Sequence, residues 1–256
     1  MKLEKITFKP KARAATAGSG AGKRAGGGAA QPPAPARRRY EDACGAAHAL
    51  DLVGERWALL VMRELMFGPR RFSDLRAALP GISANVLTQR LEGLEASGIV
   101  ERWRLPPPAA VQVYGLTRWG LDAEPIFQSL GRWAVRSPMH DLTLPLSPVS
   151  LMLSLRTMFD PSPARGLRMM VKFVFGEDAF VARVGQGTLQ AARVAVEEAG
   201  AADVIFTGST QAVAAAVHGK VPIAILESTS DLVLTGDRAA AERFVTLFAF
   251  PATAAA

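Results

Sequence analysis

The stretch from Pro69 to Arg104 reads PRRFSDLRAALPGISANVLTQRLEGLEASGIVERWR. Apolar side chains recur at helical spacing in two segments, from Phe72 to Leu79 and from Ser83 to about Ser97, and Pro80-Gly81 interrupts the pattern between them. Ser83 is a typical N-cap residue, and Gly98 stands where a left-handed residue ends many helices. The stretch therefore predicts two short helices joined by a tight turn.

Short polar side chains occupy the second helix on the side opposite its apolar stripe. A helix-turn-helix protein inserts its second helix into the major groove, where Asn and Gln side chains can pair with adenine through two hydrogen bonds. We therefore predict that Ser83, Asn85, Thr88, Gln89 and Arg90 contact DNA.

A predicted hairpin follows at once. The first strand, Ile99 to Leu105, carries Arg102 and Arg104 with period-two spacing, a proline-rich loop follows, and Val111 to Leu116 returns. Two helices and a turn occur in many small helical domains, but the added hairpin favours a winged helix. Its arginines would touch phosphates or the minor groove.

The pattern over residues 44–136 resembles the HxlR-type winged-helix transcriptional regulators. The matching pieces are Cys44, Ala49 to Trp57, Leu59-Leu60, Leu65, Phe67 to Phe72, Leu79 to Ser83, Leu87 to Leu91, Leu94, Gly98 and Tyr114 to Thr117. The resemblance implies a homodimer that binds an imperfect palindrome in double-stranded DNA. It departs from the family in its proline-rich wing, which has few polar residues.

The helices flanking this stretch follow the same resemblance. Helical patterns cover Tyr40 to Leu50, Leu52 to Phe67 and Thr117 to about Arg136, with Pro125 predicting a kink or break in the last. The family packs its first and last helices across the dimer, and some relatives use a cysteine at the position of Cys44 to sense oxidants. Because Glu41 and Asp42 oppose ionisation of a thiol, we favour a structural role for Cys44 over a redox role.

Positive charge is concentrated in the first 39 residues. The chain has a net charge of +7; residues 1–39 contain ten Lys or Arg and one Glu, whereas residues 40–136 contain eleven groups of each sign. The composition of residues 1–39 predicts a disordered tail, which either adds salt-sensitive DNA affinity or has no role. The winged helix must therefore place its arginines locally, and we expect one basic face formed by Arg70, Arg71, Arg90, Arg102 and Arg104.

The cysteine content and the apolar stretches bear on the cellular compartment of the protein. One cysteine excludes an internal disulfide framework and suits a reducing cytoplasm. No apolar stretch reaches the roughly 18 to 20 residues of a membrane span, and the N-terminus lacks the apolar core of a signal peptide. We expect a cytoplasmic protein without membrane contact.

The second half of the chain predicts a separate α+β domain. We assign residues 40–137 to the winged helix and dimerisation, 138–150 to a proline-containing linker, and 151–256 to this domain. Strand patterns at 171–175, 179–184, 202–208 and 232–236 alternate with predicted helices at 210–219 and 238–248, and 221–226 fits either a helix or a short strand. The order predicts a mainly antiparallel sheet with helices packed on it.

This domain resembles the sterol carrier protein domain. The resemblance rests on Ala202 to Ser209, the alanine-rich helix, the Gly219-Lys220 turn, Leu234 to Asp237 and the closing helix to Phe248. It implies an apolar tunnel that could hold a small apolar effector. Candidate lining residues are Phe173, Phe175, Phe206, Val217 and Phe244, although ordinary core packing or a role in dimerisation explains the same residues.

No pattern predicts catalysis, a metal site or a cofactor. His48, His140 and His218 are far apart and share no metal-ligand spacing with Cys44. We therefore predict a non-enzymatic, dimeric, DNA-binding transcriptional regulator, more specifically a repressor, whose second domain binds an apolar effector. The alternative is a lipid carrier or an interaction protein whose winged helix binds another protein.

Overall fold

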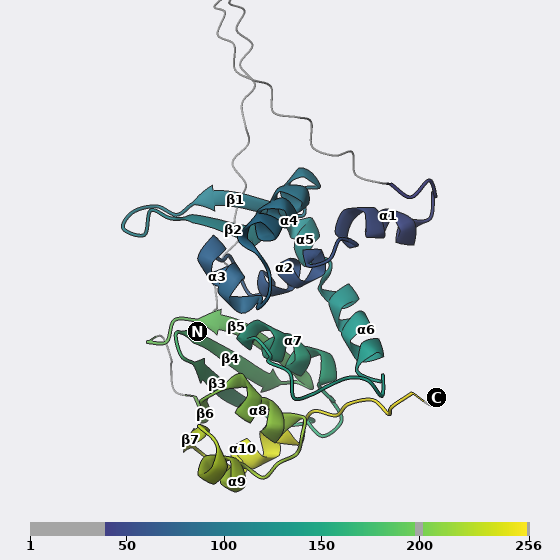
Figure 1. Cartoon of the computed structure of the whole chain (residues 1–256). Helices are drawn as coiled ribbons and strands as arrows, with labels where there is room; N and C mark the ends of the chain where they lie inside the picture. The colour runs from purple at the N-terminus through teal and green to yellow at the C-terminus, as the bar shows by residue number, and fades with distance from the viewer. Residues whose placement is uncertain (1–38, 198–201, 255–256) are drawn as a thin grey trace, which may run out of the picture. The chain divides into compact units, whose positions relative to one another are not determined.

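The N-terminal half forms a winged helix (Figure 1). A computed structural model describes residues 39–197 and 202–254, so the predicted tail lies outside the described residues apart from Arg39. The elements in order are α1 (Gly45–Val53), α2 (Ala58–Glu64), α3 (Phe72–Ala78), α4 (Ala84–Ala96), β1 (Val100–Arg104), β2 (Gln112–Leu116), α5 (Arg118–Leu121) and α6 (Glu124–Ala134). The two predicted helices, the turn and the hairpin are all confirmed.

The helix predicted from Leu52 to Phe67 is wrong. Helix α1 continues to Val53, the chain then turns, and α2 begins only at Ala58. Trp57 adopts a left-handed conformation with φ of 79°, and its ring lies 3.8 Å from where a Cβ on Gly81 would be. The helical spacing of apolar residues continues through this turn because Leu52, Val53 and Trp57 pack against the core that α2 enters, so spacing alone could not reveal the break.

The predicted break near Pro125 is confirmed. Helix α5 ends at Leu121, and α6 begins at Glu124 with Pro125 in its first turn. A proline costs no helical hydrogen bond there, because the first N–H groups of a helix have no partner within it. The chain can therefore start α6 in a new direction after α5.

The C-terminal half contains a five-stranded sheet with the order β5-β4-β3-β6-β7. Its strands are β3 (Met169–Phe175), β4 (Asp178–Gly185), β5 (Thr188–Val194), β6 (Val204–Thr207) and β7 (Val233–Gly236). Neighbouring strands are antiparallel except β3 and β6, which are parallel. The predicted, mainly antiparallel sheet is thus confirmed, with one parallel pair that the sequence did not indicate.

Helices α7 (Pro148–Met158), α8 (Thr210–Val217), α9 (Ile223–Thr229) and α10 (Arg238–Val245) complete this half (Figure 1). The side chains of Ser209 and Asp237 cap α8 and α10. Residues 223–229 are helical, which settles the ambiguous segment. Helix α7 was not predicted; it begins inside the predicted linker, where the Ser147 Oγ accepts a hydrogen bond from the N–H of Ser150 at 3.0 Å.

A row of aromatic rings defines the core face of the sheet. Phe206, Phe173 and Phe180 are register partners on adjacent strands, and all three are fully buried. The rings of Phe173 and Phe206 stack with centroids 5.6 Å apart, and Phe244 of α10 packs on both. Phe67, which follows α2, meets Phe180 edge to face at 5.6 Å, a contact worth about 0.5–1.5 kcal/mol beyond burial.

The two halves pack together within one compact unit, residues 39–256. Besides the pair of Phe67 and Phe180, a partly buried carboxylate links them: Asp178 accepts hydrogen bonds from Arg70 of the winged helix, at 2.9 Å, and from Arg193 of β5. The predicted domain boundaries at 137 and 151 stay predictions.

Candidate nucleic-acid interface

Helix α4 is held in place along one side and at both of its ends. Leu87, Leu91 and Leu94 are buried in the core, and the Ser83 Oγ accepts a hydrogen bond from the N–H of Val86 at 3.3 Å. Gly98 follows the helix with φ of 72°, a left-handed conformation that favours glycine. The helix is therefore fixed in rotation, and the direction of its outer side chains is fixed with it.

The outer side of α4 presents the predicted polar side chains. The exposed residues there are Ser83, Asn85, Thr88, Gln89 and Glu92. Asn85 and Gln89 are four residues apart, so they lie on the same helical face one turn from each other. This arrangement can offer two amide side chains to adjacent base pairs of a major groove.

Arg90 has a different environment from the other predicted DNA contacts. Its side chain is 18% exposed, pairs with the Glu55 carboxylate at 3.0 Å, and donates from Nε to the carbonyl of Arg56 at 2.9 Å. In this position it ties α4 to the turn between α1 and α2. Its contact with DNA remains a prediction, whereas its positioning role follows from these contacts.

The wing places its arginines outward. Arg102 is 53% exposed and lies 3.1 Å from Glu95, and the Nε of exposed Arg104 donates to the carbonyl of Ala110 at 2.9 Å. Trp103 packs on Gly115, where a Cβ would come within 2.6 Å of the indole. Glycine at 115 therefore leaves room for the Trp103 ring against the hairpin.

The expected basic face forms only in part. Arg71, Arg102 and Arg104 are exposed, but Arg70 is 14% exposed and turned toward Asp178 of the sheet, which corrects its placement on that face. Arg70 precedes α3 and exchanges two backbone hydrogen bonds with Tyr114 of the wing, which pull its side chain away from solvent. Three of the five arginines thus have carboxylate partners.

The predicted effector residues form a packed aromatic cluster. Phe173, Phe206, Val217 and Phe244 are fully buried, and Phe175 is 9% exposed. Four of the five are rings that contact one another at centroid distances of 5.6 to 6.4 Å. These contacts give all five a role in the core, and an effector bound among them remains a prediction.

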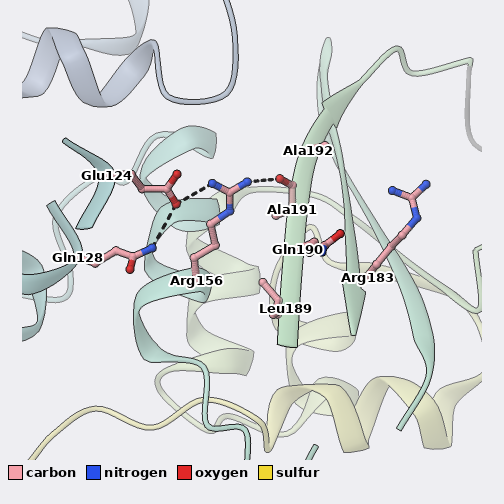
Figure 2. A pocket seen from close by; sticks show the side chains of 8 residues that line it. All are labelled: Glu124, Gln128, Arg156, Arg183, Leu189, Gln190, Ala191 and Ala192. Carbon is pink, nitrogen blue, oxygen red and sulfur yellow. Dashed lines mark hydrogen bonds and ion pairs between the residues drawn. The ribbon is translucent and has the colours of Figure 1, made fainter. Parts of the chain in front are cut away.

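A groove of about 460 Å³ lies elsewhere, at the junction of α6, α7 and β5 (Figure 2). Its lining residues are Glu124, Gln128, Arg156, Arg183, Leu189, Gln190, Ala191 and Ala192. None of them was predicted from the sequence. They come from two consecutive helices and a later β-hairpin, and no spacing rule connects the helices to the hairpin.

Cys44, for which the sequence favours a structural role, lies at the surface as a free thiol. It is exposed and precedes α1, where the N–H groups of Ala46 and then Ala47 lower the pKa of the thiol below its usual value. The direction of this shift is opposite to the one expected from Glu41 and Asp42. A redox role for Cys44 remains a prediction.

Within residues 39–197 and 202–254, no three His, Cys, Asp or Glu side chains are close enough to hold a metal ion. In the same ranges no helix is long and apolar enough to cross a membrane.

Comparisons with known proteins agree on the N-terminal half. The HxlR-like helix-turn-helix family model matches residues 52–141. YvaP of Bacillus subtilis, an uncharacterized HTH-type transcriptional regulator, is 38% identical over 86 residues, which are 34% of this chain and 80% of YvaP. The HTH-type transcriptional regulator YodB of the same organism is 40% identical over 86 residues, 34% of this chain and 77% of YodB. The structure of reduced YodB is 36% identical, covers 38% of this chain and 98% of that chain, and has a TM-score of 0.35.

Proposed function

The chain belongs to the HxlR-like helix-turn-helix family, and from this we propose that it is a DNA-binding transcriptional regulator. The observation that carries the proposal is helix α4, which is capped, anchored through three buried leucines and exposed along a polar face. Asn85 and Gln89 read base edges, while Arg71, Arg102 and Arg104 bind phosphates or the minor groove.

We further propose that the protein acts as a homodimer on a palindromic operator, and that it represses. Helices α1 and α6 bury none of their residues within the chain, and both lie to the right in Figure 1. Leu50 of α1 and Ile126, Leu130 and Trp133 of α6 are between 44% and 71% exposed. Contact with the same helices of a second copy would bury these apolar side chains.

The test is binding of the full-length protein to its own upstream DNA over a salt series, with scrambled DNA as competitor. The double variant N85A/Q89A should lose about tenfold or more of its operator affinity, since each good base contact contributes roughly 1–3 kcal/mol. Its affinity for scrambled DNA should stay unchanged. Gln211→Ala, an exposed glutamine on α8, is the matched control. Unchanged operator preference in N85A/Q89A would show that α4 does not read bases.

A second candidate function is favoured by one observation. Arg70, Arg90 and Arg102 each pair with a carboxylate, so part of the positive charge of the winged helix is already neutralised within the chain. This favours a protein-binding platform attached to a carrier of small apolar ligands. Removing Arg102 distinguishes the two: a DNA-binding wing predicts weaker binding to all sequences and a shallower salt dependence.

A further inference from the structure

The groove in Figure 2 follows the open edge of the sheet. In the strand order of the described sheet, β5 is the outermost strand, and residues 189–192 of it line the groove. Glu124 and Gln128 of α6 and Arg156 of α7 form one wall. The volume of about 460 Å³ lies within the range of small-molecule sites.

Arg156 is the central residue of this wall. Its Nη1 donates to the Glu124 carboxylate at 2.7 Å, its Nη2 donates to the carbonyl of Ala191, and its Cζ lies 4.4 Å above the ring of Phe67. The guanidinium is thus held in one orientation by three partners. A planar guanidinium so held is suited to bind a carboxylate.

The strand geometry adds a second donor. Because the carbonyl of Ala191 accepts from Arg156, it points away from β4, its only neighbouring strand among the described residues. In an antiparallel pair both backbone groups of one residue point to the same side, so the N–H of Ala191 also points into the groove. A carboxylate placed there would accept from the Ala191 N–H and from Arg156.

The other lining residues suit the apolar part of a molecule that carries this carboxylate. Leu189 and the alanines supply apolar surface, and Arg183, which makes no ion pair among the described residues, lies on the far side of β5 from Arg156 (Figure 2). Two arginines against one glutamate leave the lining positively charged. We propose that this groove binds small organic acids, with the carboxylate at Arg156 and Ala191, and that such an acid is the effector of the protein.

A route to the DNA-binding elements starts at the same arginine. Arg156 stacks on Phe67, Phe67 meets Phe180, and Arg193 lies 4.6 Å above Phe180. Arg193 pairs with Asp178, which also binds Arg70 at the start of α3. An acid that displaces Glu124 from Arg156 acts on α6 directly and on α3 through these contacts. The effector role rests on the proposed function, whereas the binding itself does not.

The first experiment is calorimetric titration of the full-length protein with hexanoate, using hexanamide and hexylamine as neutral and cationic controls. Hexanoate should bind, and the two controls should not. Arg156→Gln should weaken hexanoate binding about tenfold or more, because it removes a charge-assisted contact. Arg168→Gln, an exposed arginine outside the groove, should leave it unchanged.

A second variant separates loss of the site from loss of the fold. Glu124→Gln removes the carboxylate that competes with the ligand for Arg156, so hexanoate should bind several-fold tighter, a change that damage to the fold would not produce. Equal binding of hexanoate, hexanamide and hexylamine, or hexanoate binding unaffected by both substitutions, would overturn the proposal.

Operator binding measured with and without hexanoate on the same preparations tests the effector role. A shift in operator affinity that is absent in Arg156→Gln supports it. Hexanoate binding without any shift overturns the effector role. Operator binding without hexanoate binding overturns the acid site and leaves the proposed function standing.

Discussion

Removal of the Asp178 carboxylate should lower the free energy of unfolding, because this group joins the winged helix to the sheet. Asp178 accepts from two guanidiniums, and the side chains of Arg70, Arg193 and Asp178 are only 14%, 20% and 24% exposed. Burial, and then the nearby charge of Arg70, lowers the pKa of Arg193 to about 10. In Asp178→Ala two positive charges remain close together with no carboxylate between them.

The magnitude follows from this burial. Removing one partner of a buried ion pair costs about 3–5 kcal/mol, and the residual exposure of this cluster places the loss near 3 kcal/mol. Asp178→Asn should lose less, because the amide oxygen still accepts a hydrogen bond. Arg70→Met in the Asp178→Ala background should restore part of the loss, since it removes one of the two repelling charges.

Denaturant unfolding of the full-length protein measures these differences. The double variant D178A/R70M should deviate from additivity by about 1–3 kcal/mol. Glu177→Ala is the matched control, because Glu177 is the exposed neighbouring acid of the same turn. A loss below about 0.5 kcal/mol in Asp178→Ala, together with an additive double variant, would refute the idea that Asp178 joins the two halves.

Three further predictions follow from local geometry. Burial, and then the charge of Lys220, lowers the pKa of His218 to about 4, so its neutral form stabilises the fold fully above pH 6.5 and this contribution is lost as the pH falls toward 4. Between pH 7 and pH 4.5 the free energy of unfolding, measured with denaturant, should fall by up to about 3 kcal/mol. This fall should be smaller in His218→Asn and unchanged in the control His140→Asn. An equal fall in both variants would contradict the assignment to His218. Gly115→Ala should displace Trp103 and lower the melting temperature, measured by calorimetry, whereas Ala109→Gly in the exposed loop should change it little; a variant as stable as wild type would show that the indole has room to move. Trp133→Asp should convert the proposed dimer to a monomer in light scattering, whereas a variant that stays dimeric would move the interface away from α6.

Local rules account for most of the winged helix. The cap at Ser83, the left-handed Gly98 and the start of α6 at Pro125 are properties of single residues and their immediate neighbours, so the sequence predicts them. The polar face of α4 follows from helical periodicity in the same way. The turn at Trp57 does not, because its left-handed conformation is supported by packing against Gly81, twenty-four residues further along the chain.

Helix α7 was missed for a related physical reason. Eight of its eleven residues are buried, including Ser150 and Thr157, so it has no polar face to produce a helical pattern. Pro148 in its first turn, and Pro138 and Pro145 before it, are equally typical of a linker. A helix buried on nearly all sides is recognisable only when its neighbours are known.

The sequence by itself determined the winged helix, the cap of its helix α4 and the mainly antiparallel sheet, because each depends on periodicity or on one residue's backbone preference. Only the tertiary structure decided that Arg70 faces Asp178, that Arg156 joins Glu124 to the edge of β5, and that β3 runs parallel to β6. These contacts join residues about 30 to 110 positions apart. Pairings at such separations depend on how whole elements pack, which residue spacing in a single sequence does not encode.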